Sequence, residues 1–514
     1  MESLGEEPWD VVICGTGLQQ SLLALALSRS KKRILHVDPN DYYGEHEAAF
    51  SLQEADSWAL THAGASATQD LSAKADSTTE EPNKQSIFNN ASVWKHPEAA
   101  DRGLSFPRAY SLALAPQIVH TRSKLLAQLV SSRAYRQVEF LAVGSFFVYD
   151  AEASDASSKL ARIPSSREDV FSTQSIPARS KRSLMKFLKF VIDYDSDEQK
   201  AVWQGQENKL LSEFLASEFK LDGNLQKYIL ALTLTLDGRV TVADGLAIIN
   251  RHLTSMGLFG PGFCAVYPKW GGSSEIAQVA CRAGAVGGGI YMLDTKSEIS
   301  NDSNEISLKL SNQLSVRTTK LVTLQNEATP GAQTITRLVA VVNSPLQSLF
   351  EIVVEGAPTP TVAVVALPGG SAAGDDSSAR IYALVHSSET GECPIGQSVI
   401  YLTTLACPQS AQRLESALSS LLTAAVSAAD TTPICLYKLQ YEQSLSPREP
   451  SRVTHNGTFT FAFPSPSLSL AFDDSCLDAV EEAWKLVMGE DAAGDGYMAF
   501  EDREGVGDDD EVYD

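Results

Sequence analysis

Residues 9–38, WDVVICGTGLQQSLLALALSRSKKRILHVD, decide how the chain folds. A short apolar run ends at Gly15, a stretch with helical spacing follows, and a second apolar run ends at Asp38. This order predicts a strand, a helix and a second strand, which together form a βαβ unit. Gly15 and Gly17 stand where a dinucleotide-binding loop has its first two glycines, and Asp38 has the spacing of the acid that binds a ribose. The sequence therefore predicts an α/β fold of the dinucleotide-binding kind.

The glycine loop lacks one residue that a bound dinucleotide needs. Gln20 replaces the third glycine of the motif, and its long side chain rises where helix, strand and pyrophosphate approach closely. A flavin enzyme of this architecture also needs a late strand that ends in a Gly-Asp turn. The candidate, Ala492–Gly496, follows a helical pattern inside the acidic tail. We therefore expect no bound cofactor, and a flavin-dependent oxidoreductase remains as one alternative.

The composition is typical of a folded protein without a membrane span. Apolar residues make up 43% of the 514 residues and charged residues 20%. The sequence contains no uncharged apolar run of about 18 residues, the length that a spanning helix needs. Its acidic start, MESLGEEPWD, differs from a secretory signal, which begins with a basic stretch and an apolar core. We therefore expect a cytoplasmic protein.

The net charge and the cysteines argue against two kinds of site. The net charge is −23, whereas binding to nucleic acid depends on clustered Lys and Arg side chains that neutralise phosphates. A basic protein is a more suitable partner. The seven cysteines are odd in number and have no CxxC spacing, so the sequence predicts neither a disulfide framework nor a metal site.

The hydrophobic pattern divides the chain into regions. From Pro164 to about Arg251 it is that of amphipathic helices, whereas short strand patterns lie on both sides. A stretch rich in Ser, Thr, Ala, Asp and Lys predicts a disordered insertion, and the acidic tail is too polar to fold alone. The expected regions are a discontinuous large domain (1–58, 106–162 and 252–488), a disordered insertion (59–105), a helical domain (163–251) and a disordered acidic tail (489–514).

Several motifs resemble one known family. Besides Gly15-Thr16-Gly17-Leu18, they are Leu35-His36-Val37-Asp38, Asn40-Asp41-Tyr42-Tyr43-Gly44, Tyr267-Pro268-Lys269-Trp270-Gly271 and Gly288-Gly289-Ile290-Tyr291-Met292-Leu293. Together they resemble the family of Rab GDP-dissociation inhibitors and Rab escort proteins. The resemblance covers most of the chain except the insertion and the tail. It implies a flavoenzyme-like large domain with mixed sheets and a smaller all-helical domain, without a cofactor and without catalytic residues.

Three regions resemble the escort branch of this family. They are residues 163–171 followed by 181–190, residues 386–394, and the segments 48–51 and 57–58. The resemblance implies a carrier that binds GDP-bound Rab GTPases and presents them to the α/β heterodimer of Rab geranylgeranyl transferase. It also implies that the carrier shields the geranylgeranyl lipid of the product and meets membranes transiently. A Rab GDP-dissociation inhibitor, which recycles Rab without docking to the transferase, is the other alternative.

The resemblance implies a Rab-binding platform on the large domain. The family's platform positions fall on Tyr43, Glu275, Arg282 and Met292. Glu275 and Arg282 are two helical turns apart, so both side chains can lie on one helix face. A charged pair beside an aromatic residue and a methionine is typical of a surface that binds a partner.

The helical domain is the expected docking surface for the transferase. On a helical wheel of residues 182–194, Phe187 belongs to a broad apolar stripe that forms the core. Phe190 falls outside this stripe, beside Lys186 and Ser183. A few aromatic side chains carry most of the binding energy at many interfaces. We therefore expect Phe190 to be an exposed anchor for the transferase, with Phe187 as the alternative.

Overall fold

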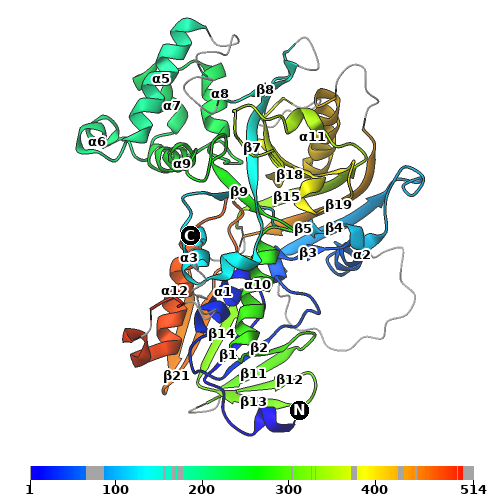
Figure 1. Ribbon diagram of the computed structural model, residues 1–514, viewed down its shortest axis with the longest axis vertical. Helices are drawn as coiled ribbons and strands as arrows, with labels where there is room; N and C mark the ends of the chain where they lie inside the picture. Colours follow the sequence, from blue (N-terminus) through cyan, green and yellow to red (C-terminus); the bar gives the residue numbers. More distant parts are fainter. Residues whose placement is uncertain are drawn as a thin grey trace, which may run out of the picture.

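The computed structural model has three lobes (Figure 1). A six-stranded sheet and its helices form the lower lobe in Figure 1, a larger sheet forms the upper right lobe, and helices α5 to α9 form the upper left lobe. The structure describes residues 2–64, 86–153, 158–164, 170, 177–301, 305–325, 327–329, 331–371, 379–426, 433–445, 449–494 and 496–501.

The lower lobe is built on the predicted βαβ unit. Its strands, in spatial order, are β10 (Ile290–Met292), β2 (Ile34–Val37), β1 (Val11–Cys14), β14 (Lys320–Leu324), β21 (Thr458–Phe463) and β20 (Ser451–His455). All pairs are parallel except that of the edge strand β20. Helix α1 (Leu18–Leu27) connects β1 to β2 and is buried along its whole length between α10 (Ser273–Val286) and α12 (Ser475–Met488). The βαβ prediction for residues 9–38 is confirmed.

Strand β1 is covered on both faces, which explains its continuous apolar run. Val11 and Ile13 pack into the core that contains α1. Val12 belongs to a separate core, which includes residues of the three-stranded sheet β11 (Ser297–Asn301), β12 (Ile306–Leu310) and β13 (Ser315–Thr318). Successive side chains of a strand point to opposite faces, so a strand with two covered faces is apolar throughout.

The upper right lobe is a ten-stranded mixed sheet. Its path runs through β4 (Phe88–Lys95), β19 (Cys435–Ser444), β15 (Thr334–Val342), β18 (Ser398–Leu405), β17 (Ile381–Ser387), β16 (Val362–Leu367), β7 (Phe140–Tyr149), β9 (Ala265–Pro268) and β6 (Val119–His120), and β8 (Leu160–Arg162) also pairs with β7. Helix α11 (Ser410–Ala424) covers one face of it. The remaining regular elements are α2 (Leu52–Thr61), α3 (Lys124–Ser131) and the short pair β3 (Ala49–Phe50) and β5 (Leu112–Ala113).

The helical lobe is inserted into this sheet between β8 and β9. Its helices are α5 (Ala178–Ile192), α6 (Asp197–Trp203), α7 (Leu211–Phe219), α8 (Gly223–Ala231) and α9 (Val242–Ser255). They enclose an apolar core of their own. Strand β8, which precedes the insertion, and strand β9, which follows it, both pair with β7. The chain therefore leaves the sheet beside β7, forms the helical lobe, and re-enters the sheet beside the same strand.

Phe190 is buried in the core of the helical lobe, so the expectation of an exposed anchor is wrong. Its side chain is 6% exposed, and its ring centroid lies 6.1 Å from that of Phe214 and 5.0 Å from that of Phe219, both in α7. The alternative anchor, Phe187, is fully buried as well. The helical wheel assumed that α5 has one covered face. In the structure α5 packs against both α7 and α9, so a second side of the helix, which carries Phe190, is also buried.

Two regions expected to be disordered are ordered in part. Residues 86–105 belong to the fold, because β4 adds an edge strand to the large sheet and Phe88 lies in the core. In the tail, Met498 is 1% exposed and the ring of Tyr497 contacts Trp484 of α12. A few apolar side chains in otherwise polar segments suffice to dock them. Within both expectations, residues 65–85, 495 and 502–514 lie outside the described residues.

Phe190→Ala should destabilise the protein, because it removes a buried aromatic ring. Such truncations lower the free energy of unfolding by about 3–5 kcal/mol. Ile192→Ala is the matched control, since Ile192 lies on the same helix but is 50% exposed; it should cost less than ~1 kcal/mol. Urea unfolding followed by circular dichroism measures both. Equal, small losses would mean that Phe190 is accessible after all.

Candidate functional site

The glycine loop is filled by a side chain of the chain itself. Glu45 is buried, and its carboxylate lies so close to Gly15 and Gly17 that a Cβ atom on Gly15 would collide with it. Gln20, the residue that replaces the third glycine, donates a hydrogen bond from Nε2 to Oε2 of Glu45 at 3.0 Å. Gln20 therefore holds an internal carboxyl group in the place where a dinucleotide-binding fold holds its pyrophosphate.

A second carboxylate lies at the start of α1. The backbone N–H of Leu18, the first residue of the helix, donates to Oε2 of Glu47 at 3.4 Å. The N-terminus of a helix attracts anions, because its first N–H groups lack partners and the helix dipole is positive there. Glu47 uses this feature for an intramolecular contact instead of a ligand.

Asp38 is also fully engaged within the protein. Its Oδ2 accepts hydrogen bonds from the N–H and the hydroxyl of Thr16 at 2.7 and 2.6 Å, and its Oδ1 accepts from the N–H and the side-chain amide of Asn40 at 2.7 and 3.0 Å. Glu45 and Glu47 occupy the loop, and both carboxylate oxygens of Asp38 already accept hydrogen bonds from within the protein. These residues therefore do not fit a dinucleotide.

Burial of these acids perturbs their protonation. Burial, followed by the charges of Asp38 and Glu47, raises the pKa of Glu45 well above its ordinary value. Burial raises the pKa of Glu47 to about 7, although hydrogen bonds from the backbone of Leu18 and of Glu47 itself oppose the shift. Desolvation disfavours the charged form of a carboxyl group, and nearby like charges add to this effect.

The structure places the four predicted platform residues in the lower lobe, but Met292 packs against the core on the sheet face opposite the one that α10 covers. Glu275 and Arg282 both lie on α10. Burial raises the pKa of the Glu275 carboxyl, and the positive charge of Arg282 opposes this shift in part. Met292 ends the edge strand β10 of the six-stranded sheet. Tyr43 directly precedes the turn at Gly44. It is close enough to Cys281 and Tyr291 to interact with both electrostatically, and these two residues directly precede Arg282 and Met292 in the sequence.

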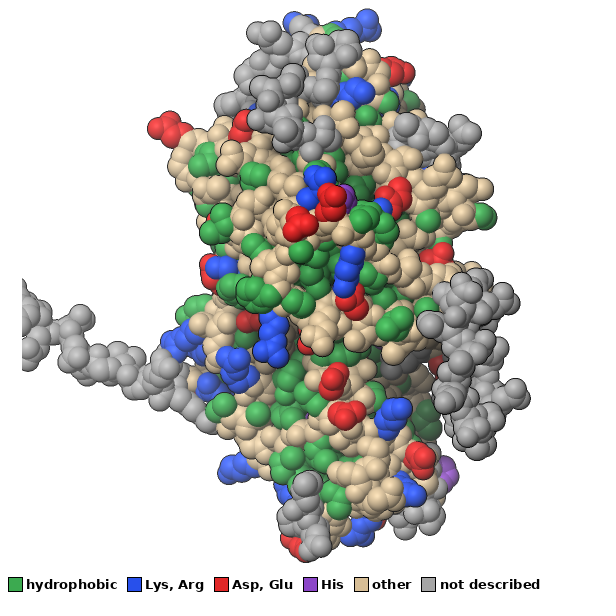
Figure 2. Space-filling model, turned by 90° about the vertical axis from the view of Figure 1, so that its right-hand side faces the viewer, with side chains coloured by type: hydrophobic (Ala, Val, Ile, Leu, Met, Phe, Trp, Pro, Cys, Tyr) green, Lys and Arg blue, Asp and Glu red, His purple; other side chains and the backbone are tan. Residues whose placement is uncertain are grey.

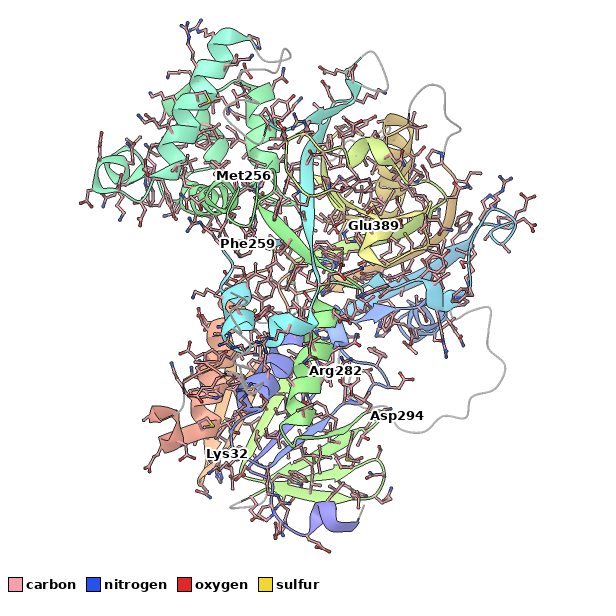
Figure 3. All side chains as sticks on the ribbon, in the orientation of Figure 1. Lys32, Met256, Phe259, Arg282, Asp294 and Glu389 are labelled. Atoms are coloured by element: carbon pink, nitrogen blue, oxygen red, sulfur yellow. The ribbon has the colours of Figure 1, made fainter. Side chains whose placement is uncertain are left out.

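These four side chains differ in exposure. Arg282 is exposed, whereas Tyr43, Glu275 and Met292 are partly buried. Figure 3 places Arg282 on the same lobe as Asp294, below the level of the helical lobe. On the face shown in Figure 2, basic, acidic and apolar side chains are interspersed, so the net negative charge is not concentrated there. We call these four residues the platform: an exposed cation and an acid on α10, an aromatic ring near α10, and a methionine at the end of the edge strand β10.

A large apolar cavity lies between the helical lobe and the sheet. Its volume is about 910 Å³, near the upper end of the range of roughly 300–1,000 Å³ that is usual for small-molecule pockets. Helices α5, α8 and α9 contribute most of its walls, and Gly144, Ser145 and Phe146 of β7 line it from the sheet. Its apolar side chains include Met185, Leu188, Ile229, Leu232, Leu253 and Met256.

The rim of the cavity carries basic and exposed apolar side chains. Arg182, Lys186 and Lys189 line it from α5. Ile192 and Val353, which also line it, are 50% and 40% exposed. The interior of this cavity therefore suits a flexible apolar chain, and its rim suits a negatively charged or polar attachment.

Sequence reasoning missed both the internal carboxyl groups and the cavity. Glu45 and Glu47 stand directly after the Asn40–Gly44 motif, and two acids in a segment that must pack on a glycine loop were the available signal. The cavity had no such signal, because apolar residues that line a cavity and apolar residues of a core follow the same helical periodicity. No helix in the described part of the chain combines the length and the apolar character that crossing a membrane requires.

Comparisons with known proteins identify sequence relatives. The sequence profile of the family described as GDP dissociation inhibitor matches residues 5–76 and 81–352. A "Rab proteins geranylgeranyltransferase component A" of Saccharomyces cerevisiae is 29% identical over 80% of this chain and 64% of its own length. "Rab escort protein 1" of Arabidopsis thaliana is 26% identical over 94% of this chain and 93% of its own length. The chain thus spans less than two thirds of the yeast relative.

Comparisons with solved structures identify the fold. A Rab GDI from Plasmodium falciparum superposes with a TM-score of 0.64 at 17% identity, over 94% of this chain and 98% of that one. An oxidoreductase from Methanosarcina mazei superposes with a TM-score of 0.56 at 12% identity, over 93% and 99%. The predicted fold class, a flavoenzyme-like large domain with mixed sheets and a smaller helical domain, is confirmed.

Glu47→Gln should stabilise the protein at pH 8 but not at pH 5. The folded state raises the pKa of Glu47 from 4.5 to about 7, so it favours the protonated acid. This contribution to stability is complete below about pH 4.5 and is lost as the pH rises through 7. The neutral amide avoids that loss, so its advantage at pH 8 should be roughly 1–3 kcal/mol in urea unfolding. Glu98→Gln, at an exposed position, is the control. An advantage that is equal at both pH values would contradict this account.

Gly15→Ala should cost more stability than Gly288→Ala. Both glycines have positive φ angles, +94° and +99°, so an alanine at either position lowers the free energy of unfolding by about 1–2 kcal/mol because of the left-handed backbone. At Gly288 the new methyl group meets open space, whereas at Gly15 it meets the Glu45 carboxylate. Overpacking of this kind adds about 1–3 kcal/mol. Parallel thermal and urea unfolding of the two variants measures the difference, and identical losses would mean that Glu45 does not occupy the loop.

Proposed function

The chain belongs to the GDP dissociation inhibitor family, and on this premise we propose that it is an escort for Rab GTPases. The family resemblance inferred from the sequence motifs is confirmed. In this role the protein binds GDP-bound Rab, presents it to the α/β heterodimer of Rab geranylgeranyl transferase and carries the prenylated product. It has no catalytic residues and takes no cofactor. It works in the cytosol and meets membranes transiently.

The observation that carries this proposal is the separation of a polar platform and an apolar cavity on different lobes of one chain. Arg282 marks the platform and Met256 the cavity, and Figure 3 shows them on different lobes. A folded GTPase needs a polar, partly exposed surface, while its lipid needs an apolar enclosure. One chain with both sites can hold the two parts of a prenylated GTPase at once, and each contact raises the effective concentration for the other.

The platform is the proposed Rab-binding site. Arg282 is exposed, and the partly buried Glu275 is its electrostatic neighbour on α10. This arrangement offers a partner both signs of charge on one helix, which favours a surface with complementary charges. Tyr43 and Met292 add aromatic and flexible apolar surface, which interfaces favour over Lys and Ser.

The cavity is the proposed site for the geranylgeranyl chain. Each methylene that leaves water contributes about 0.8 kcal/mol, so a long isoprenoid gains substantially from enclosure. The apolar walls of the cavity come from α5, α8 and α9, which belong to the helical lobe. The basic side chains of Arg182, Lys186 and Lys189 at its rim suit the carboxyl terminus of a lipidated peptide.

The outer surface of α5 is the proposed contact for the transferase. Because Phe190 and Phe187 are both buried, neither can anchor the contact directly. Ile192, which is 50% exposed at the end of α5, is the accessible apolar residue of this helix, and lysines and an arginine precede it. The names of the two relatives, a transferase component and an escort protein, favour this role over that of a recycling inhibitor without transferase docking.

A flavin-dependent oxidoreductase is the remaining alternative, and the glycine loop disfavours it. The side chains of Glu45 and Glu47 occupy the space and the helix N–H group that the pyrophosphate of FAD would need. The likeness to the Methanosarcina oxidoreductase concerns the fold alone, at 12% identity.

Arg282→Ala should weaken Rab binding and prenylation without unfolding the protein. Loss of an interface hot spot costs at least ~2 kcal/mol, or about thirtyfold in affinity. Arg452→Ala is the matched control, because Arg452 is an exposed arginine on β20, at the opposite edge of the same sheet from β10. The assay reconstitutes geranylgeranylation of a Rab from the chain, the transferase heterodimer and geranylgeranyl diphosphate. Wild-type protein that binds Rab but never supports the reaction would favour the recycling inhibitor.

Met256→Trp should reduce affinity for a prenylated ligand, because the indole fills part of the cavity. We expect at least a ~10-fold weaker Kd for a fluorescent geranylgeranylated peptide, which corresponds to about 1.4 kcal/mol. Leu258→Trp is the control, since Leu258 lies two residues away, is 48% exposed and does not line the cavity. Binding of unprenylated Rab should stay unchanged in both variants. Equal effects of the two substitutions would place the lipid elsewhere.

A further inference from the structure

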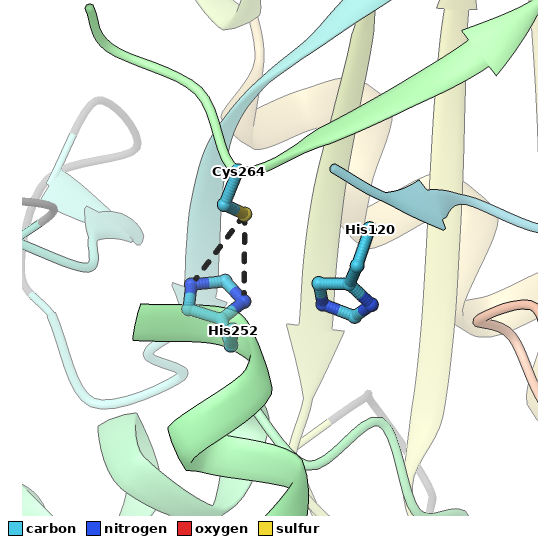
Figure 4. Close-up of side chains that lie close together, drawn as sticks. All are labelled: His120, His252 and Cys264. Carbon is cyan, nitrogen blue, oxygen red and sulfur yellow. Dashed lines mark hydrogen bonds between the residues drawn. The ribbon is translucent and has the colours of Figure 1, made fainter. Parts of the chain in front are cut away.

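Three side chains that can ligate a metal ion meet where the helical lobe joins the large sheet (Figure 4). His120 ends strand β6, His252 lies in the last turns of α9, and Cys264 directly precedes β9. The ligating atoms of the three all lie within 4.8 Å of one another. Each residue is at most 4% exposed, so water does not compete freely for these atoms.

The distances between these atoms are close to those of a shared metal ion. The sulfur of Cys264 lies 3.5 Å from Nδ1 of His252. Zinc binds imidazole nitrogen at about 2.0–2.1 Å and thiolate sulfur at about 2.3 Å, so a tetrahedral site separates the two donors by about 3.5 Å. Since the ligating atoms lie within 4.8 Å of one another, His120 needs a shift of up to about 1.5 Å to complete a three-ligand set of this size.

His120 is the independent sign that something is missing from this cluster. Neither of its ring nitrogens has a hydrogen-bond partner, although its side chain is almost completely buried. Buried polar groups in proteins are nearly always paired.

We propose that His120, His252 and Cys264 form a binding site for a divalent transition metal of intermediate softness, with Zn²⁺ as the natural occupant. Imidazole and thiolate are the donors that this class of ion prefers. Three protein ligands leave one tetrahedral position for water or another small donor. Binding releases the thiol proton of Cys264 to solvent, because the thiolate is the ligand. The thiolate also reduces the excess positive charge, and the nearby Arg251 is paired with Asp474 at 3.2 Å.

A metal ion at this place would connect the two lobes across the cavity. His252 lines the cavity and belongs to α9, whereas His120 and Cys264 belong to the edge of the large sheet. The ion would therefore fix the end of α9 against β6 and β9 and hold one wall of the cavity in position. This inference does not depend on the identity of the cavity's ligand.

Co²⁺ absorption tests the site in the full-length protein. After removal of metals with a chelator, one equivalent of Co²⁺ should give a thiolate-to-metal band in the near ultraviolet and visible bands of tetrahedral intensity, and Zn²⁺ should abolish both. Zn²⁺ should also raise the melting temperature of the stripped protein by at least ~2 °C. Wild-type protein without a stoichiometric thiolate band would overturn the proposal.

Matched variants assign the band to these residues. Cys264→Ser should lose the thiolate band, and His120→Ala should lower the affinity for Co²⁺ at least ~100-fold, while Cys407→Ser, which also removes one cysteine, should behave as wild type. Circular dichroism of the metal-free variants checks their folding. If Cys264→Ser does not fold, His120→Ala decides the question, because its ring has no partner to lose. A band that survives in His120→Ala at unchanged affinity would reduce the cluster to a hydrogen-bonded Cys-His pair and contradict the proposal.

Discussion

The carboxylate of Glu45, buried against the glycine loop before helix α1, is the interaction on which the rest of the structure depends. In dinucleotide-binding folds a phosphate from a ligand brings the negative charge to this helix N-terminus. Here a carboxyl group of the chain takes that place, because left-handed backbone at Gly44 (φ 98°) and Glu45 (φ 42°) folds the segment after β2 back over the loop. The same turn holds Tyr43 beside α10 and β10, where the other platform residues lie. A buried carboxyl group thus occupies the place of a cofactor and fixes the turn that carries Tyr43.

Much of the lower lobe could be predicted from the sequence, because its signals are local. Two apolar runs around a helical stretch define the βαβ unit, and the family motifs located Tyr43, Glu275, Arg282 and Met292 on one lobe. The helical lobe shows where local signals end. A helical wheel assumes one covered face, but α5 lies between α7 and α9, so Phe190 is buried although it lies off the main stripe. Which neighbours surround a helix depends on tertiary packing, which periodicity does not encode.

Other features escaped prediction because they join residues that are far apart in the chain. His120 and His252 are separated by 132 positions, and no spacing rule for metal ligands covers such a distance. The edge strand β4 was hidden by the polar composition around it, although Phe88 and its pairing with β19 dock it firmly. The cavity also escaped prediction, because the residues that line it come from three helices and the middle of β7, which are far apart in the chain. The composition of a segment is an average over many residues, whereas the docking of a strand or the formation of a cavity depends on a few particular side chains.

The attachment of the helical lobe to a single strand has an evolutionary consequence. Residues 140–143 of β7 pair with β9, residues 147–149 pair with β8, and Gly144 and Ser145 between them line the cavity. The chain thus enters and leaves the lobe at neighbouring points, which is the arrangement that tolerates insertion of a whole domain. Helices in the lobe can lengthen, shorten or be exchanged without a change in sheet register. Because the sheet provides the floor of the cavity and the inserted helices provide its walls, changes in the insert can alter the cavity while the lower lobe stays unchanged.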